Sequence, residues 1–256
     1  MAAELRYDRL SGQWVSIVGN RQARPNLPAT GCPFCVGGLE APDPYDVKAF
    51  VNRWPAYEPG GPIDLDAARA AGIDAVGAVG AAEVVLYSPK HDGSLGSLGQ
   101  EQIRKVIDLW AERTEALLAR PEIDYVLVFE SRGTEVGATI HHPHGQLYAF
   151  PFVPPAARIE AEQTRAHGEC VVCAELERER LDDERMVVDY GAWAAWVPFA
   201  SAYPYGVNVV PTQHVGSLAD LLDEDRDRLA KVLEDVLGRY DRLWADDPNR
   251  SEIFPY

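Results

Sequence analysis

The chain has 256 residues, of which 46% are hydrophobic and 25% are charged, a balance typical of a globular protein with a substantial core. Its formal net charge of −16 excludes a general nucleic-acid binder, which needs a basic surface to contact phosphates. The sequence contains no run of about 18 apolar residues that could span a membrane, and its N-terminus lacks the apolar core of a secretory signal. We therefore expect a cytoplasmic protein that binds neither nucleic acid nor membrane.

The N-terminal part of the chain predicts strands separated by long loops. Residues 5–18 read as a hairpin with its turn at 8–12. Residues 36–49 and 59–81 are rich in glycine, proline, alanine and aspartate, which predicts loops. Between them, residues 49–55 predict a short strand that ends in polar groups.

Two buried strands and a long helix are predicted next. The strands are residues 83–87 and 125–129, both short apolar runs. The helix is predicted to begin at Ser97, with Gln100 completing a capping box. Its apolar face repeats at helical spacing through Ile103, Val106, Ile107, Trp110, Leu117 and Leu118.

The most unusual stretch of the chain places three of its six histidines, His141, His142 and His144, within four positions. On an extended chain His142 and His144 share one face while His141 points to the other. Pro143 removes a backbone donor and confines the segment to an edge or an irregular strand end. Two imidazoles on one face suit metal binding, nucleophilic catalysis, or one of each.

Two pairs of cysteines have the same spacing, Cys32-x-x-Cys35 and Cys170-x-x-Cys173. In a cytosolic protein this spacing favours metal or redox chemistry over structural disulfides. Because a proline-rich loop precedes Cys32 and glycines follow Cys35, the context favours a zinc knuckle over the strand-to-helix context of a redox motif.

The second half of the chain repeats the layout of the first. Adding 123 (214 − 91) carries His91 to His214, and it carries Ser94 to Ser217. Each repeat then holds a C-x-x-C pair, a strand ending in histidine, a long helix and a further strand. The sequence predicts an α+β protein of two tandem repeats, residues 1–155 and 156–256, each an antiparallel sheet with a long helix packed on it.

The second repeat is expected to be incomplete in this sequence. In the first repeat the histidine pair begins 51 residues after the strand-end histidine (142 − 91). Its counterpart would fall near residue 265, beyond Tyr256. We expect a natively longer second repeat or a truncation.

Four side chains of the first repeat have the composition of a closed, structural zinc site: Cys32, Cys35, His91 and His142. This assignment leaves His144 without a metal. A neutral imidazole held at one nitrogen by a backbone carbonyl presents the other nitrogen as a nucleophile.

Residues near the histidines suit phosphate oxygens. The loop from Gly137 to His141 has backbone N–H groups and the hydroxyl of Thr139 for this purpose. Arg21 and Arg24, three apart in an earlier loop, suit either a phosphate clamp or a solvated turn, and charge alone favours the turn. His141 itself is expected to face outward.

Four strings together resemble the galactose-1-phosphate uridylyltransferase family, a branch of the histidine-triad superfamily built from two histidine-triad-like units. The strings are Cys32-x-x-Cys35, Ser88-Pro89-x-His91, Phe129-Glu130-x-x-Gly133 and His142-Pro143-His144-Gly145-Gln146. The resemblance runs from about Tyr7, through Arg21-x-x-Arg24-Pro25, to the final Phe254-Pro255-Tyr256.

The resemblance implies a two-step exchange and a set of site residues. His144 would attack the α-phosphorus of UDP-glucose and release glucose 1-phosphate, and galactose 1-phosphate would then take the UMP group to give UDP-galactose. The family's zinc ligands fall on Cys32, Cys35, His91 and His142, and Gln146 falls on the glutamine that binds the phosphoryl group. The implied substrate-binding positions are Arg21, Arg24, Asn52, Ser131, Gly137 and Thr139. The family usually forms dimers, which implies a homodimer.

The chain departs from the family pattern at several points. Ser131 stands where the family usually has asparagine, which would weaken nucleotide contacts. Cys170, Cys173 and His214 could hold a second zinc only if water or a further residue completes the site. Because the C-terminal segment is absent, we expect partial or no activity from these 256 residues alone.

Two alternative functions remain open. One is a phosphorylase of the same superfamily that acts on a nucleotide sugar or dinucleoside polyphosphate with phosphate as acceptor, although Gln146 favours the transferase. The other is a zinc-containing nucleotide-binding module without turnover.

Overall fold

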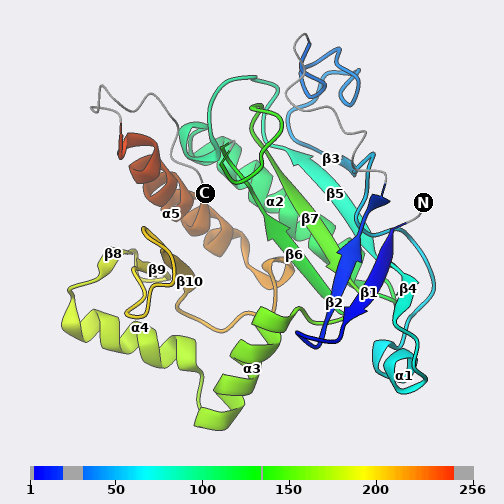
Figure 1. Cartoon of the computed structure of the whole chain (residues 1–256). Coiled ribbons are helices and arrows are strands. Elements are labelled where there is room, and N and C mark those ends of the chain that lie inside the picture. Colours follow the sequence, from blue (N-terminus) through cyan, green and yellow to red (C-terminus); the bar gives the residue numbers. More distant parts are fainter. Residues whose placement is uncertain (1–2, 20–30, 134, 245–256) are drawn as a thin grey trace. The chain divides into compact units, whose positions relative to one another are not determined.

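The structure, a computed structural model, describes residues 3–19, 31–133 and 135–244 (Figure 1). Among these residues the chain forms two compact units. The first unit takes in residues 3–92 and 112–157, and the second takes in residues 93–111 and 158–244. Both combine antiparallel sheets with helices, which confirms the α+β class. None of the helices in the described part is long and apolar enough to cross a membrane.

The centre of the first unit is a four-stranded antiparallel sheet in the order β3–β5–β7–β6. Its strands are β3 (Lys48–Val51), β5 (Ala81–Leu86), β7 (His144–Phe150) and β6 (Tyr125–Phe129). β6 covers the same residues as the predicted strand 125–129. Pro143 lies just before β7, so its missing N–H removes no bond from the ladder.

A second sheet, in the order β2–β1–β4, is built on the predicted N-terminal hairpin. Its strands are β1 (Glu4–Asp8), β2 (Gln13–Ile17) and β4 (Ala75–Gly77). The hairpin turn forms because the Asp8 carboxylate accepts hydrogen bonds from the Leu10 N–H and the Ser11 hydroxyl. Gly12 completes the turn at a φ of 71°, which glycine adopts without strain.

The alternation of side chains gives the four-stranded sheet two different faces. Glu83 of β5 points to one face, where Arg113 of helix α2 (Gln100–Leu118) donates two hydrogen bonds of 2.8 Å to its carboxylate. Val84 and Leu86 point to the opposite face and pack with Phe34. The second half of α2 therefore covers one face of the sheet, and the loop around Phe34 covers the other.

The second unit contains a three-stranded antiparallel sheet, in the order β10–β9–β8, that packs against helix α5. The elements are β8 (Met186–Asp189), β9 (Trp193–Trp196), β10 (Asn208–Pro211), α4 (Val171–Asp182) and α5 (Asp223–Arg242), and α3 (Pro155–His167) leads into this unit. The buried face of α5 has Leu229, Val232 and Val236 at helical spacing, as its sequence pattern predicts. The fully buried Glu179 of α4 is paired with Arg185 at 2.8 Å.

The repeat of 123 residues extends to the boundaries of the helices. The 3-10 turn η2 (Leu95–Ser97) has its counterpart in η3 (Leu218–Asp220), and α2 and α5 begin at Gln100 and Asp223, again 123 apart. The hydroxyl groups of Ser94 and Ser217 cap the two 3-10 turns. The offset predicted from a few matched residues therefore also relates these turns and helix starts.

The predicted cap of the long helix is wrong. The capping box joins Ser94 and Ser97, because each hydroxyl accepts a hydrogen bond from the backbone N–H of the other. The Ser97 side chain is thus used at the end of η2 and cannot cap α2. Gly99, at a φ of 82°, separates η2 from α2, which begins at Gln100.

Two further expectations are corrected. Residues 59–81, expected to be a loop, contain β4 and the short helix α1 (Leu65–Ala70), which is capped by the Asp64 carboxylate. The strand expected over 49–55 ends at Val51, because the Asn52 side chain accepts the Trp54 N–H and turns the chain. The repeat boundary expected after residue 155 falls at the start of α3 and stays a prediction.

Candidate functional site

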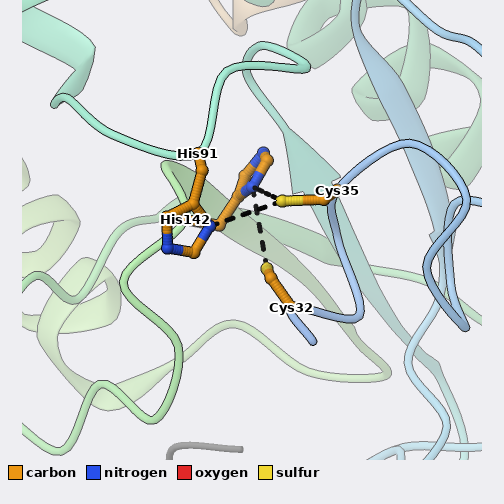
Figure 2. A group of neighbouring side chains, drawn as sticks. All are labelled: Cys32, Cys35, His91 and His142. Carbon is orange, nitrogen blue, oxygen red and sulfur yellow. Dashed lines mark hydrogen bonds between the residues drawn. The ribbon is translucent and has the colours of Figure 1, made fainter. Parts of the chain in front are cut away.

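The four predicted zinc ligands of the first unit lie together (Figure 2). The ligand atoms of Cys32, Cys35, His91 and His142 are all within 4.8 Å of one another, and their side chains converge on one point. The sulfur–nitrogen distances are 3.4 Å from Cys35 to His91, and 3.8 Å and 3.7 Å from Cys32 and Cys35 to His142. A tetrahedral zinc ion with its usual bond lengths separates sulfur and nitrogen by about 3.6 Å. The donor set and its spacing therefore fit a zinc ion.

A tight turn presents the two cysteines. The Gly38 N–H donates to the Cys35 carbonyl at 2.8 Å, and the Glu40 N–H donates to the Pro33 carbonyl at 2.9 Å. A Cβ on Gly38 would come within 2.5 Å of the Cys32 carbonyl oxygen. Only glycine fits this position, so the glycines after Cys35 shape the turn that holds both sulfurs.

His142 is fully buried, and its ring is held from the side opposite the sulfurs. Its Nε2 lies 2.7 Å from the Ser88 carbonyl oxygen and 3.0 Å from the Tyr45 hydroxyl. A proton on Nε2 leaves the Nδ1 lone pair facing the two sulfurs, as a metal ligand requires. Burial lowers the pKa of His142 and so favours this neutral form.

The Tyr45 hydroxyl links the cysteine turn to the buried histidine. It donates a hydrogen bond of 2.7 Å to the Phe34 carbonyl, which lies between the two cysteines. Burial is the main cause that raises the pKa of Tyr45 to about 12, so the phenol keeps its proton for this bond. No sequence pattern indicated Tyr45, because its role depends on the contact between two loops.

His144 is the first residue of β7 and has a fixed ring orientation. Its Nδ1 lies 2.7 Å from the His142 carbonyl oxygen, so Nδ1 carries the proton and Nε2 carries the lone pair. The His144 ring also packs edge-on against Phe34, with 5.0 Å between the ring centroids. His141 is exposed, in agreement with the outward position expected for it.

Gly145 is needed for packing within the sheet. A Cβ at this position would lie 1.9 Å from the Tyr87 hydroxyl oxygen and 3.0 Å from the Phe129 carbonyl. The absence of a side chain thus lets Tyr87 pass beneath β7.

A pocket of about 330 Å³ lies beside the metal-ligand cluster. This volume is in the range of small-molecule sites. Its wall is formed by Gly31, Cys32, Pro33, Phe34, Gly38, Leu39, Glu40, Phe50, Asn52, Arg53, Trp54, Val84, Ile140, His144 and Gln146. The predicted catalytic pair and Asn52 therefore line one pocket together with several aromatic side chains.

The register of the sheet orders the pocket from one end to the other. On one face, Gln146 of β7 pairs with Val84 of β5, which pairs with Phe50 of β3. Since neighbouring strands are about 4.8 Å apart, Gln146 and Phe50 lie about 10 Å from each other across the sheet. His144 is beside Gln146 at the β7 end, and Asn52 follows β3 at the other end.

The remaining predicted substrate-binding residues are placed as follows. Ser131, Gly137 and Thr139 lie in the loop between β6 and β7 and are not among the described residues that line the pocket. The Thr139 hydroxyl is buried and has no hydrogen-bond partner within the described part of the chain. Arg21 and Arg24 lie outside the described residues.

Sequence reasoning missed most of the pocket wall. Phe50 lies two residues before Asn52, which the resemblance had already indicated, and this spacing on an extended segment could have indicated Phe50 as well. The contribution of Phe34, Glu40 and Arg53 had no comparable signal, because it depends on how the cysteine turn folds over the sheet.

The second unit also brings its cysteine pair to a histidine. The ligand atoms of Cys170, Cys173 and His214 lie within 4.8 Å of one another, and the sulfur of Cys173 is 3.4 Å from His214. Unlike Cys32, Cys170 stands at the start of a helix, α4, where hydrogen bonds from backbone N–H groups lower its pKa. The cluster offers three ligands among the described residues.

Comparison with known proteins identifies the family of the chain. Residues 1–154 match the model of the galactose-1-phosphate uridyl transferase N-terminal domain, and residues 157–256 match that of its C-terminal domain. The class defined by these matches is that of the nucleotidyltransferases. Within it, the chain belongs to the galactose-1-phosphate uridylyltransferase family.

Individual relatives show the same likeness. The chain is 37% identical to the galactose-1-phosphate uridylyltransferase of Thermotoga maritima over 99% of its own length and 78% of the relative. It is 34% identical to the Streptomyces lividans enzyme of the same name, over 95% of its own length and 66% of that relative. A solved uridylyltransferase structure is similar at a TM-score of 0.79 and 30% identity, over 93% of this chain and 75% of that one. The chain also shares its fold with an ADP-glucose phosphorylase from Arabidopsis thaliana. The TM-score is 0.69 and the identity 23%, over 96% of this chain and 80% of that one.

Proposed function

We propose that this protein transfers the uridylyl group of UDP-glucose to galactose 1-phosphate. The observation that carries the proposal is His144, whose Nδ1 is bonded to the His142 carbonyl and whose ring lines a pocket of suitable size for a nucleotide. The names of the relatives support galactose 1-phosphate as a substrate and the uridylyl group as the group transferred. The family resemblance of the sequence implies UDP-glucose as the donor.

The reaction would proceed in two displacements at one phosphorus atom. In the first, the Nε2 lone pair of His144 forms a bond to the α-phosphorus of UDP-glucose. The bond from that phosphorus to the bridging oxygen breaks, and glucose 1-phosphate leaves with the electron pair. In the second, a phosphate oxygen of galactose 1-phosphate attacks the same phosphorus and the P–N bond breaks. The His142 carbonyl holds the Nδ1 proton throughout and stabilises the positive charge of the ring in the intermediate.

The polar groups near His144 would receive the charge on the phosphoryl oxygens. Gln146 follows His144 on the same face of β7 and offers an amide donor. The buried Thr139 hydroxyl, with Gly137 and Ser131 in the same loop, would bind phosphate oxygens, and Asn52 would contact the nucleoside. Arg21 and Arg24 complete the proposed substrate-binding set.

Cys32, Cys35, His91 and His142 would hold a structural zinc ion in this scheme. Bound there, the ion would cross-link the cysteine turn to the segment that begins β7, without contact with the phosphate. Because His142 also holds His144 through its carbonyl, the zinc site would fix the direction of the nucleophile. We propose that Cys170, Cys173 and His214 hold a second zinc ion with a further ligand.

We also propose the remaining features of the protein that the sequence predicts. The two repeats, residues 1–155 and 156–256, would be the structural domains, with the chemistry in the first. The protein would be a homodimer, as the family resemblance implies, and a cytoplasmic protein that does not bind membranes. It would not bind nucleic acid, for which the net charge of −16 is the support.

Isotope exchange tests the proposed function. The residues proposed for the first displacement all lie in the first repeat, so this step should proceed even if the complete reaction is partial or lost in these 256 residues. The wild-type protein should therefore move radiolabelled glucose 1-phosphate into UDP-glucose without any galactose 1-phosphate, because the first displacement is reversible and needs no acceptor. His144→Ala should abolish the exchange. Exchange that persists in His144→Ala would contradict the proposal.

The acceptor separates the proposed transferase from the rival functions. Consumption of UDP-glucose with inorganic phosphate, at a rate equal to that with galactose 1-phosphate, would favour the phosphorylase. Binding of UMP without any exchange would favour the nucleotide-binding module.

A further inference from the structure

One ion pair stands in the wall of the pocket. The Glu40 carboxylate lies 2.8 Å from Nε of Arg53. The Glu40 side chain is 16% exposed and that of Arg53 is 44% exposed. No other aspartate, glutamate, lysine or arginine is among the described residues that line the pocket. The pocket wall thus carries one full negative and one full positive charge, side by side.

The pair lies at the end of the pocket that is far from the phosphorus chemistry. The α-phosphorus has to reach His144 on β7, and Arg53 follows β3, two strands across the sheet. A nucleotide with its phosphorus at His144 therefore extends its base toward the β3 end. The ring of Phe34 lies between the two ends, 5.0 Å from the His144 ring and 6.0 Å from the Phe50 ring, measured between centroids. The Phe50 ring, on β3, offers an apolar face to a base at the far end.

Both members of the pair are held by their surroundings. The Glu40 backbone is bonded at its N–H to the Pro33 carbonyl and at its carbonyl to Nζ of Lys48, at 2.8 Å. The Arg53 guanidinium lies over the Trp54 ring, 5.9 Å from the centroid. Charged groups that are held in place read a ligand better than mobile ones, because less ordering is needed on binding.

We propose that the Glu40–Arg53 pair reads the edge of the nucleobase and favours uracil over cytosine. Uracil presents the O4 acceptor beside the N3–H donor, which complements a guanidinium N–H beside a carboxylate oxygen. Cytosine reverses both groups, since it presents an amino donor and the N3 acceptor. The two bases have the same size, so only the polar pattern of the wall can separate them. The inference rests on the proposed function, because it places the phosphorus at His144.

The size of the effect follows from the mismatch. Cytosine would set its amino group against the guanidinium and its N3 lone pair against the carboxylate. A site built to hydrogen-bond one pattern rejects the reversed pattern by a factor on the order of 100 or more. Glutamine at position 40 keeps the volume of glutamate but can rotate its amide to present either a donor or an acceptor.

Calorimetric titration with UMP and CMP, and initial rates of glucose 1-phosphate release from UDP-glucose and CDP-glucose, test the inference. The wild-type protein should prefer the uracil ligand by about 100-fold or more, and Glu40→Gln should lower this preference by about tenfold or more. Arg53→Lys, which keeps the charge but loses the planar fork, should also lower it. Glu4→Gln is the matched control, since Glu4 pairs with Arg6 outside the pocket wall and should leave the preference unchanged.

The outcomes separate the inference from the proposed function. Equal affinity of the wild-type protein for UMP and CMP would overturn the inference. It would also be overturned if Glu40→Gln and Arg53→Lys each lost affinity for UMP and for CMP by the same factor. Selective binding of UMP without release of glucose 1-phosphate would instead support the inference and contradict the proposed function. Thermal melting of each variant verifies that it is folded.

Discussion

At the scale of single residues, Tyr45 connects the two parts of the candidate zinc site. Its hydroxyl donates to the Phe34 carbonyl in the cysteine turn and lies 3.0 Å from Nε2 of His142. Partners of this kind orient a metal-ligating histidine and fix its tautomer. The cysteine turn and His142 come from segments about a hundred residues apart, so a contact between them should matter to metal affinity.

Tyr45→Phe should therefore weaken zinc binding by about tenfold or more, because the turn loses the bond that ties it to the buried histidine. Competition with a coloured chelator measures this affinity. Tyr57→Phe is the matched control, since Tyr57 also lies in the first unit but packs in a separate core cluster that includes Leu5 of β1. Equal zinc retention by both variants would show that Tyr45 has no positioning role.

At the scale of elements, the 3-10 turn η2 packs closely against helix α5 within the second unit. This close contact is possible because residue 96 is a glycine. A Cβ on Gly96 would lie 2.8 Å from Cβ of Leu237 and 2.9 Å from the Gly238 nitrogen. The η2 turn thus lies directly on the α5 backbone. A side chain of any size would force the two elements apart.

Gly96→Ala should destabilise the protein by about 1–3 kcal/mol, because the methyl group overpacks this contact. Thermal melting should show a lower Tm. Gly61→Ala, at a position with open space around it, should leave the Tm unchanged or slightly raise it. A Tm for Gly96→Ala equal to that of Gly61→Ala would contradict this account of the contact.

The elements also show what the sequence could predict. Periodicity and the offset of 123 residues located the long helices and the strands β5 and β10, which precede His91 and His214, because these signals are local or repeated. The cap at Ser94 was missed because two serines three apart compete for one role, and the tertiary contact decides between them. The Glu40–Arg53 pair and Tyr45 could not be predicted, since each joins loops whose meeting no local pattern encodes.

At the scale of the whole molecule, the two cysteine–histidine clusters imply two separable metal sites. Cys35→Ser should remove about one zinc per chain, and Cys173→Ser should remove the second, because each cluster lies within its own unit. Metal analysis of the purified variants measures the loss. A wild-type content below about one zinc per chain would contradict the first site.

The proposed zinc ion of the first unit should matter to both stability and activity. Removal of zinc by a chelator should lower the Tm and abolish isotope exchange, because the zinc site of the first unit would hold His144 in place. Both should return when zinc is restored. Exchange at the full rate in the zinc-free protein would show that the cluster does not position the nucleophile.

In the proposed reaction, His144 carries the uridylyl group as a covalent intermediate. Intact-mass analysis of the protein after incubation with UDP-glucose tests it most directly. The wild type, and His141→Ala as the control for an exposed neighbouring histidine, should each gain the mass of one uridylyl group in an acid-labile bond. His144→Ala should gain none. No adduct on the wild type, or an undiminished adduct on His144→Ala, would contradict the assignment of the nucleophile.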